Sequence, residues 1–161
     1  KDLAYFGEFG IRGVGYNVKD LNRTILKILG LSEGWNIALV GIGNLGLALS
    51  TYRGFKDRGF TITCIFDNNP EKVGMIVNGI EVMHIDRIEE IIPQRKTQIG
   101  AITVPASAAQ DVADKLVRAG IKAILNFAPV VLNVPPEIEL RNVDLSVNLE
   151  VLTFNLGGRM A

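Results

Sequence analysis

The sequence predicts a doubly wound α/β fold built on a parallel sheet. Short apolar runs, typical of strands buried on both faces, alternate along the chain with segments whose apolar residues recur at helical spacing. A glycine-rich turn joins a first strand, 37–42, to a helix, 45–55, and a second strand, 62–67, follows and ends in Asp67. This order of strand, glycine turn, helix and strand is that of a Rossmann-type nucleotide-binding unit.

Each glycine of the turn has a separate physical role. Gly41 allows the tight turn out of the strand, Gly43 leaves the backbone open to a pyrophosphate, and Gly46 lets the helix pack closely on the strand. Asp67 lies 21 residues beyond Gly46, where a carboxylate accepts hydrogen bonds from an adenosine ribose and repels a 2′-phosphate, so NAD(H) is favoured over NADP(H). Lys72 is either a solvated side chain or a contact for the adenosine end. The cofactor contacts predicted in this half are Gly41, Ile42, Gly43, Asn44, Leu45, Gly46, Asp67, Asn68 and Lys72.

Two elements are expected before this unit. Residues 1–16 alternate aromatic, glycine and charged residues, which favours a β-hairpin, and residues 18–29 carry apolar residues at helical spacing. The first 29 residues hold five Lys/Arg and three acids, a slight basic bias whose simplest interpretation is a solvated surface.

The elements after Asp67 continue the alternation. Asn78-Gly79 predicts a hairpin with a type I′ turn, and His84 follows it, away from the strand ends where ligands bind. The remaining predictions are a helix at 86–92 with Asp86 as its N-cap and Pro93 near its end, a strand at 99–104, a helix at 105–119 closed by Gly120, and strands at 123–127 and 138–143.

Two strand ends are expected to contact the nicotinamide side of a dinucleotide. One carries Thr103-Val104-Pro105 and the other Asn126-Phe127-Ala128, and both follow strands at the crevice where the order of a doubly wound sheet reverses. Most of these contacts are expected through backbone groups. The alternative is that both segments are ordinary exits from a strand into a loop.

The terminal segment, 144–156, predicts an apolar helix with Ser146 as its N-cap. Leu145, Leu149, Leu152 and Leu156 form one stripe, and a second stripe follows Val147, Val151 and Phe154. A helix with this much apolar surface is not expected to stand free in water. It either packs on its own domain or inserts into a partner subunit.

Composition limits the function classes. The chain has 161 residues, 48% hydrophobic and 21% charged, and a formal net charge of zero, which fits one globular domain and disfavours a strong polyanion binder. The single cysteine, Cys64, lies in an apolar strand and excludes an internal disulfide framework, so a cytoplasmic location is expected. No apolar run approaches ~18 residues, so no membrane span is predicted.

The residues of a catalytic centre are missing from the pattern. A dehydrogenase needs a proton donor or acceptor beside the nicotinamide, and the one histidine, His84, is not placed for that role. No cluster of His, Cys and Asp has metal-ligand spacing, and no second domain is available to hold a substrate. The sequence therefore predicts cofactor binding without catalysis and without a metal.

Four segments of the chain are specific enough to identify a family. They are K-D-L-A-Y-F-G-E-F-G-I-R-G-V-G-Y at 1–16, G-I-G-N-L-G-L-A-L at 41–49, N-F-A-P at 126–129 and V-D-L-S at 143–146. Through these segments nearly the whole chain resembles the Rex family of redox-sensing transcriptional repressors. The resemblance implies that 1–30 holds the end of a winged-helix DNA-binding domain and a linking helix, that 31–143 is the NAD(H)-binding domain, and that 144–161 is a swapped dimerisation helix with its tail. Most of the DNA-binding domain would then be absent from this chain.

The resemblance also implies a mechanism. Rex proteins are homodimers in which the C-terminal helix swaps into the partner near the nicotinamide; NADH favours a closed dimer that releases operator DNA, and NAD+ competes and permits DNA binding. Tyr52 and Asp144 match a tyrosine in the first helix and an aspartate before the swapped helix that respond to redox state in related proteins. Leu145 stands where some relatives have an aromatic residue. The partner arginine of that switch would lie in the missing DNA-binding domain.

Two other functions remain as alternatives. One is a small NAD-dependent oxidoreductase, which the lack of a catalytic base and of a substrate domain disfavours. The other is a CoA-binding domain of a ligase subunit, which shares this sheet and glycine turn; Asp67 favours a ribose diol over a 3′-phosphorylated nucleotide.

Overall fold

The computed structural model describes residues 18–29 and 34–160 and divides into two compact units. The first unit comprises Lys1–Trp35 and Arg53–Thr61, and the second comprises Asn36–Tyr52 and Ile62–Ala161. The hairpin predicted at 1–16 lies outside the described residues.

The described part of the first unit contains two helices. α1 (Val18–Ile28) matches the helix predicted at 18–29, and none of its residues is buried. α3 (Arg53–Asp57) is a short helix, and the backbone N–H of Trp35 donates to the carbonyl of Gly59 just after it at 2.8 Å.

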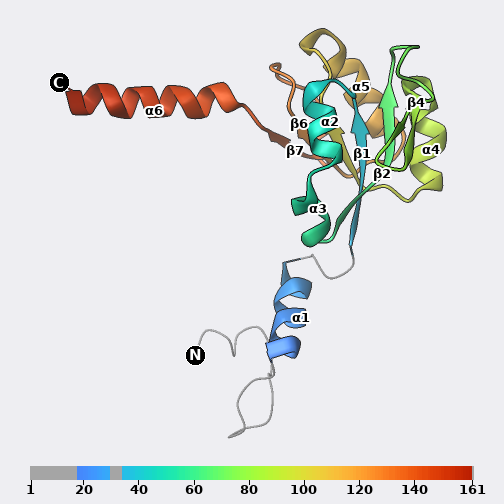
Figure 1. The fold of residues 1–161 in the computed structure, drawn as a ribbon, viewed down its shortest axis with the longest axis horizontal. Helices are drawn as coiled ribbons and strands as arrows, with labels where there is room; N and C mark the ends of the chain where they lie inside the picture. Colours follow the sequence, from blue (N-terminus) through green and yellow to red (C-terminus); the bar gives the residue numbers. More distant parts are fainter. Residues whose placement is uncertain (1–17, 30–33, 161) are drawn as a thin grey trace, which may run out of the picture. The chain divides into compact units, whose positions relative to one another are not determined.

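The sheet confirms the predicted doubly wound fold. Its seven strands follow the order β3-β4-β2-β1-β5-β6-β7. The pairs β2–β4, β1–β5, β5–β6 and β6–β7 are parallel, and the β3–β4 hairpin is antiparallel. The chain starts in the middle of the sheet and builds outward in both directions, so the strand order reverses at β1 and β5 (Figure 1). The strands are β1 (Trp35–Val40), β2 (Phe60–Asp67), β3 (Ile76–Val77), β4 (Ile80–His84), β5 (Ile99–Ile102), β6 (Ala123–Asn126) and β7 (Glu139–Asn142).

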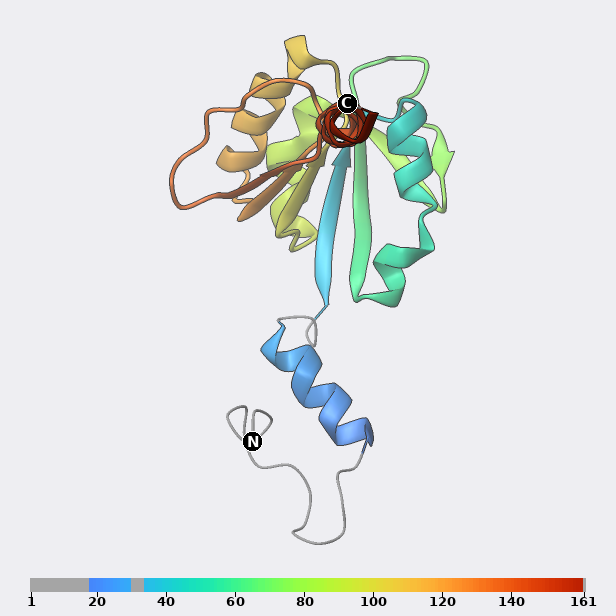
Figure 2. The same ribbon diagram turned by 90° about the vertical axis from the view of Figure 1, so that its left-hand side faces the viewer.

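Helices of the second unit cover both faces of this sheet. α2 (Asn44–Ser50) lies on one face, and α4 (Ile88–Gln94) and α5 (Ala106–Arg118) lie together on the other (Figure 2). This arrangement follows from right-handed crossovers, because the chain leaves β1 in one direction and returns past it to β5 in the other. The core between the sheet and the helices α4 and α5 is aliphatic and includes Ile88, Ile102 and Leu116, all fully buried.

Several local predictions need correction. The helix predicted at 45–55 is broken: α2 ends at Ser50, and α3 begins only at Arg53. Asp86 does not cap α4, because it lies inside a 3₁₀ turn, η2 (Ile85–Arg87), whose cap is His84. The hairpin turn is as predicted, with positive φ at Asn78 and Gly79.

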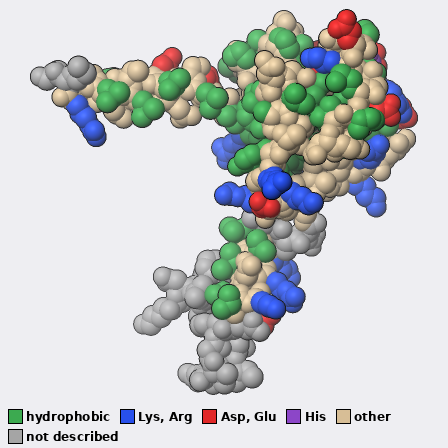
Figure 3. All heavy atoms as spheres, viewed as in Figure 1, with side chains coloured by type: hydrophobic (Ala, Val, Ile, Leu, Met, Phe, Trp, Pro, Cys, Tyr) green, Lys and Arg blue, Asp and Glu red, His purple; other side chains and the backbone are tan. Residues whose placement is uncertain are grey.

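The terminal helix is longer than predicted. α6 runs from Leu145 to Met160, past the predicted end at Leu156. Asp144 serves as its cap in place of Ser146: its Oδ1 accepts the backbone N–H of Ser146 at 2.9 Å and also the Ser146 hydroxyl. The apolar side chains of α6 are exposed in the single chain, as Figure 3 shows along the helix, and Phe154 is 82% exposed. Packing on its own domain, one of the two predicted alternatives, is therefore not what the single chain adopts.

Candidate functional site

The turn after β1 has the backbone geometry that its glycines predict. Gly41 has φ +97°, and its N–H donates to the carbonyl of Phe66 at 2.8 Å, which ties the turn to β2. A Cβ at Gly41 would lie 2.7 Å from the carbonyl oxygen of Thr103, and a Cβ at Gly46 would collide with the carbonyl oxygen of Gly41. Both positions therefore need glycine for conformation or for close packing.

Gly43 differs from these two glycines. A Cβ built there meets nothing within 4 Å, so the backbone at this position faces open space. Gly43 precedes the first residue of α2, and its carbonyl accepts the N–H of Leu47 at 2.9 Å. The first N–H groups of α2 are left without partners inside the helix, as at any helix start, and an anion can be bound there.

Asp67 holds the turn in place. It is 7% exposed, and its Oδ2 accepts the N–H of Ile42 at 2.8 Å while its Oδ1 accepts the N–H of Asn69 at 2.8 Å. The predicted role was to accept hydrogen bonds from a ribose. Each carboxylate oxygen has a second lone pair, so Asp67 has acceptor capacity left after both backbone bonds are made.

Thr103 connects β5 to the same turn. Its hydroxyl lies 2.6 Å from the carbonyl oxygen of Gly41 and 3.0 Å from that of Val40, and its N–H donates to Val40 at 2.9 Å. Because β1 and β5 are adjacent and parallel, these bonds bring the ends of the two strands together at the point where the sheet order reverses.

A cavity of about 510 Å³ lies at this edge of the sheet. Most of the predicted cofactor contacts line it: Gly41, Gly43, Asn44, Leu45, Asp67, Asn68, Lys72, Thr103, Val104, Pro105 and Phe127. They come from the ends of β1, β2, β5 and β6 and from the loops that follow, so the topology gathers residues that are up to 86 positions apart (41 to 127). Its size falls in the range of small-ligand sites.

Four predicted contacts do not line the cavity: Ile42, Gly46, Asn126 and Ala128. Ile42 and Gly46 are buried in the turn beneath it. The Asn126 side chain is 1% exposed and is engaged with backbone groups of the loop that follows, so it supports the wall behind Phe127. Its side-chain amide therefore has a structural role, and the contact with ligand predicted for this segment, mostly through backbone groups, stays a prediction.

Four lining residues were missed by the sequence analysis: Asn69, Ile85, Ala108 and Val112. Ala108 and Val112 lie four positions apart on α5 and therefore share one face of that helix. Their spacing was visible in the sequence, but it reads equally well as ordinary core packing. Ile85 follows β4, and only the pairing of β4 with β2 brings it to the cavity.

The two predicted switch residues lie outside this cavity. Tyr52 is 59% exposed and follows the end of α2, so it is not inside the first helix as predicted. Asp144 is exposed at the start of α6, and its hydrogen bonds from Ser146 lower the pKa of its carboxyl. Asp144 borders a second cavity of about 700 Å³, together with Ala128, Pro129, Val130, Val131, Asn142, Val143, Val147 and Asn148.

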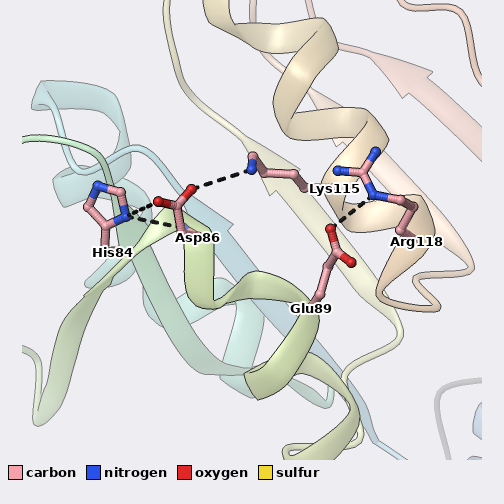
Figure 4. A network of polar contacts seen from close by, with 5 residues as sticks. All are labelled: His84, Asp86, Glu89, Lys115 and Arg118. Atoms are coloured by element: carbon pink, nitrogen blue, oxygen red, sulfur yellow. Dashed lines mark hydrogen bonds and ion pairs between the residues drawn. The ribbon is translucent and has the colours of Figure 1, made fainter.

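His84 occupies a different place from the one predicted. It is the last residue of β4, in register with Asp67 of β2, so it lies at the ligand-binding edge of the sheet. Its side chain is nevertheless not among those that line the cavity, and its Nδ1 accepts the N–H of Asp86 at 3.2 Å. Figure 4 shows it in a surface network in which Asp86 pairs with Lys115 and Glu89 pairs with Arg118, at 3.4 and 2.9 Å.

Two further observations bear on chemistry. Cys64 is fully buried, and burial raises the pKa of its thiol, which disfavours the reactive thiolate. Across residues 18–29 and 34–160, no group of three or more His, Cys, Asp or Glu is arranged to hold a metal ion, and no helix is long and apolar enough to cross a membrane.

The fold and this site define a Rossmann-type nucleotide-binding domain. Residues 32–130 match the family model described as a CoA binding domain. The redox-sensing transcriptional repressor Rex of Desulfitobacterium hafniense is 71% identical over 161 residues, which are 100% of this chain and 77% of that protein.

Solved structures point the same way. The crystal structure of RSP in complex with beta-NAD+ and operator DNA superposes with a TM-score of 0.87 at 43% identity, over 99% of this chain and 73% of that one. RSP in complex with beta-NADH superposes with a TM-score of 0.82 at 41% identity, over 99% and 74% of the two chains. RSP is described as a Rex-family repressor. The chain belongs to the Rex family of redox-sensing transcriptional repressors, whose members are regulators rather than enzymes.

Proposed function

We propose that this chain is the NADH- and NAD+-sensing core of a redox-responsive repressor. The observation that carries the proposal is the cavity at the ends of β1, β2 and β5, where Gly43 leaves the backbone open and the Asp67 carboxylate is bonded to the same turn. The relative RSP has been solved with beta-NAD+ and with beta-NADH, which supports the same ligands here. A cytoplasmic location follows from the proposal, since operator DNA is the expected partner of the complete repressor.

The residues present fit a dinucleotide. Gly43 and the first N–H groups of α2 would hold the pyrophosphate, and Asp67 would accept hydrogen bonds from the adenosine ribose with its remaining lone pairs. Lys72 would lie beside the adenosine end. Thr103, Val104, Pro105 and Phe127 would border the nicotinamide.

The charge on this wall favours the reduced ligand. When bound, the dinucleotide supplies a ring that is positively charged in NAD+ and neutral in NADH. Of the described residues that line the cavity, only Asp67 and Lys72 are charged, and both would lie toward the adenosine end. Thr103, Val104, Pro105 and Phe127, which would border the nicotinamide, carry no charge. A positive ring placed there without an acid would lose hydration and gain no partner. We therefore expect tighter binding of NADH.

The exposed apolar face of α6 supports a homodimer through that helix. Its exposed residues include Leu149, Leu152 and Phe154, which a second copy would cover. We further propose that Tyr52 and Asp144 respond to the redox state of the ligand across this dimer, and that NADH favours the arrangement that releases operator DNA. The division into 1–30, 31–143 and 144–161 is part of the same proposal. The ligand can shift the dimer only by its difference in affinity for the two arrangements.

The test is a fluorescence titration of the chain with NADH, followed by competition with NAD+, NADPH and CoA. Saturable binding of one NADH per chain, weaker competition by NAD+ and little by NADPH or CoA are expected. Tight displacement by CoA would instead support the function named by the family model for 32–130. Consumption of NADH in the presence of small carbonyl compounds would support the oxidoreductase alternative.

A further inference from the structure

Asn126 lies between the cavity and the start of α6. It is the last residue of β6, and the next residue, Phe127, lines the cavity. On its other side β7 runs parallel, with Asn142 in register, and the N–H of Val143 donates to the carbonyl of Asn126 at 2.8 Å. Asp144 and α6 follow directly, so one residue contacts both regions.

The side-chain amide of Asn126 is surrounded by more hydrogen-bond acceptors than it has N–H groups to donate. Its Oδ1 accepts the N–H of Ala128 at 2.9 Å, which fixes its orientation, because the flipped amide would set oxygen against carbonyl oxygens. Its Nδ2 then lies 3.1 Å from the carbonyl of Ala128, 3.2 Å from that of Val130 and 3.0 Å from Oδ1 of Asn142. A primary amide has two N–H groups, so three acceptors compete for two protons.

These acceptors belong to two different parts of the molecule. The carbonyls of Ala128 and Val130 belong to the loop that follows Phe127, and this loop also borders the second cavity. The side chain of Asn142 belongs to the end of β7, two residues before Asp144. A stronger hydrogen bond from Nδ2 to the loop carbonyls therefore weakens the one to Asn142, and the reverse also holds.

The far end of the same loop is held independently. Gln110 on α5 donates from Nε2 to the carbonyl of Asn133 at 2.9 Å and accepts the N–H of Asn133 at Oε1 at 2.8 Å. With that end fixed to α5, movement of the wall behind Phe127 has to be taken up at the Asn126 end.

We propose that Asn126 is a positioning residue that couples the cofactor cavity to the start of α6, by dividing its two N–H donors between the loop carbonyls and Asn142. A ligand that shifts Phe127 changes the distances from Nδ2 to the Ala128 and Val130 carbonyls, and so changes the bond to Asn142. This inference rests on the proposed binding of NADH in the first cavity. Its physical basis is the hydrogen-bond network around the buried Asn126 side chain, in which one bond cannot change without its neighbours.

Asn142 offers a clean way to break the coupling. It is exposed, so Asn142→Ala removes one acceptor without leaving a cavity in the core, and both N–H groups of Asn126 keep carbonyl partners. Asn142→Asp keeps an acceptor oxygen at the same place and serves as the conservative variant. Gln110→Ala is the matched control, because it releases the other end of the loop at a half-buried position and leaves the Asn126–Asn142 bond intact.

The experiment is amide hydrogen exchange of the whole chain with and without NADH, read separately at residues 41–46 and at residues 145–148. In the parent protein NADH is expected to slow exchange at both places. In Asn142→Ala the slowing at 41–46 stays, whereas that at 145–148 falls by about fivefold, the effect of losing one net hydrogen bond. Asn142→Asp and Gln110→Ala are expected to keep both responses.

Three outcomes would overturn the coupling while leaving the binding proposal intact. These are slowing at 41–46 with no response at 145–148 in the parent, an unchanged response at 145–148 in Asn142→Ala, or an equal loss in Gln110→Ala. The absence of slowing at 41–46 in the parent would instead overturn NADH binding itself. A failure of NADH binding is therefore detected at residues 41–46, and a failure of the coupling alone is detected at residues 145–148.

Discussion

Gly43 and Gly46 lie three residues apart in one turn, but a methyl group would meet different surroundings at each. At Gly46 it would strike the carbonyl oxygen of Gly41, and at Gly43 it would enter open space. The first position is constrained by packing within the chain. The second is free in the protein alone, so a constraint there would come from a ligand.

This difference predicts opposite behaviour for two alanine variants. Gly46→Ala is expected to lower the free energy of unfolding by about 1–3 kcal/mol, because the turn and α2 have to move apart. Gly43→Ala is expected to leave that free energy nearly unchanged and to weaken NADH binding by at least about tenfold, a cost of ~1.4 kcal/mol. Urea unfolding and NADH titration of both variants measure the two effects. A Gly43→Ala protein that binds NADH like the parent would contradict the placement of the pyrophosphate.

Asp67 is a residue whose role in the fold precedes any role in binding. Its carboxylate accepts the N–H groups of Ile42 and Asn69, one on each oxygen. Asp67→Asn places an amide N–H against one of these donors and leaves a buried N–H without an acceptor. We expect a loss of about 1–3 kcal/mol in the free energy of unfolding.

The same variant tests the predicted discrimination against a 2′-phosphate. Removing the negative charge is expected to raise the affinity for NADPH relative to NADH. Both affinities are measured by titration at one salt concentration, since exposed charges are screened by salt. If the ratio of the two affinities stays that of the parent, ribose recognition by Asp67 is not supported, whatever happens to stability.

At the scale of single elements, α6 depends on a cap at its first turn. Asp144 accepts two hydrogen bonds from Ser146, and these bonds lower the pKa of its carboxyl below the ordinary value of 3.8. A carboxyl with a lowered pKa in the folded state stabilises that state at pH values above its unfolded pKa. The contribution is lost as the pH falls through the folded pKa.

We therefore expect the first turn of α6 to fray only in acid. The backbone amide signal of Ser146, followed by NMR from pH 6 to about pH 2, should titrate with a midpoint below 3.8, the ordinary carboxyl value. Ser146→Ala removes the hydroxyl donor. In this variant the titration midpoint, measured on the amide signal of Val147, should rise toward 3.8. A midpoint at or above 3.8 in the parent would mean that the cap does not form in solution.

The break between α2 and α3 shows where periodicity is insufficient. Apolar residues continue at helical spacing through Phe55, and this predicted one helix across 45–55. The structure ends α2 at Ser50, whose hydroxyl donates to the carbonyl of Leu47 at 2.6 Å, and a short non-helical link carries Tyr52. Side-chain hydroxyls that bond to nearby backbone carbonyls compete with the helix, and such local competition does not appear in a hydrophobic pattern.

At the scale of the whole molecule, α6 leaves a row of apolar side chains exposed to solvent. Leu149 and Leu152 are 62% and 56% exposed in the single chain. A helix that exposes this much apolar surface needs a partner in water, and the partner proposed above is a second copy of the chain.

Leu152→Asp is expected to convert a dimer to a monomer, because a charge would be buried without a partner at the proposed interface. Sedimentation velocity of the parent and the variant measures the change. Glu150→Gln, an exposed polar substitution on the same helix, is the control and should remain dimeric. Dimers of equal stability for Leu152→Asp and the parent would place the interface elsewhere.

The class of the fold and the position of the main site were accessible from residues close together in the chain. Short apolar runs that alternate with segments of helical spacing indicate a parallel sheet, because its strands are buried on both faces and are therefore apolar throughout. The glycine turn and Asp67 locate the cavity, because conformation and close approach demand particular residues there. These are local requirements, so the sequence records them directly.

Other features depended on contacts between distant parts of the chain. The pairing of β4 with β2 brings His84 level with Asp67 and Ile85 into the cavity, and no local pattern reports which strands are neighbours. The structural role of the Asn126 amide is a further example, because its partners belong to β7 and to the loop after Phe127. A hydrogen bond needs a partner at a defined distance, and only the folded chain supplies partners that lie 16 residues away in the sequence.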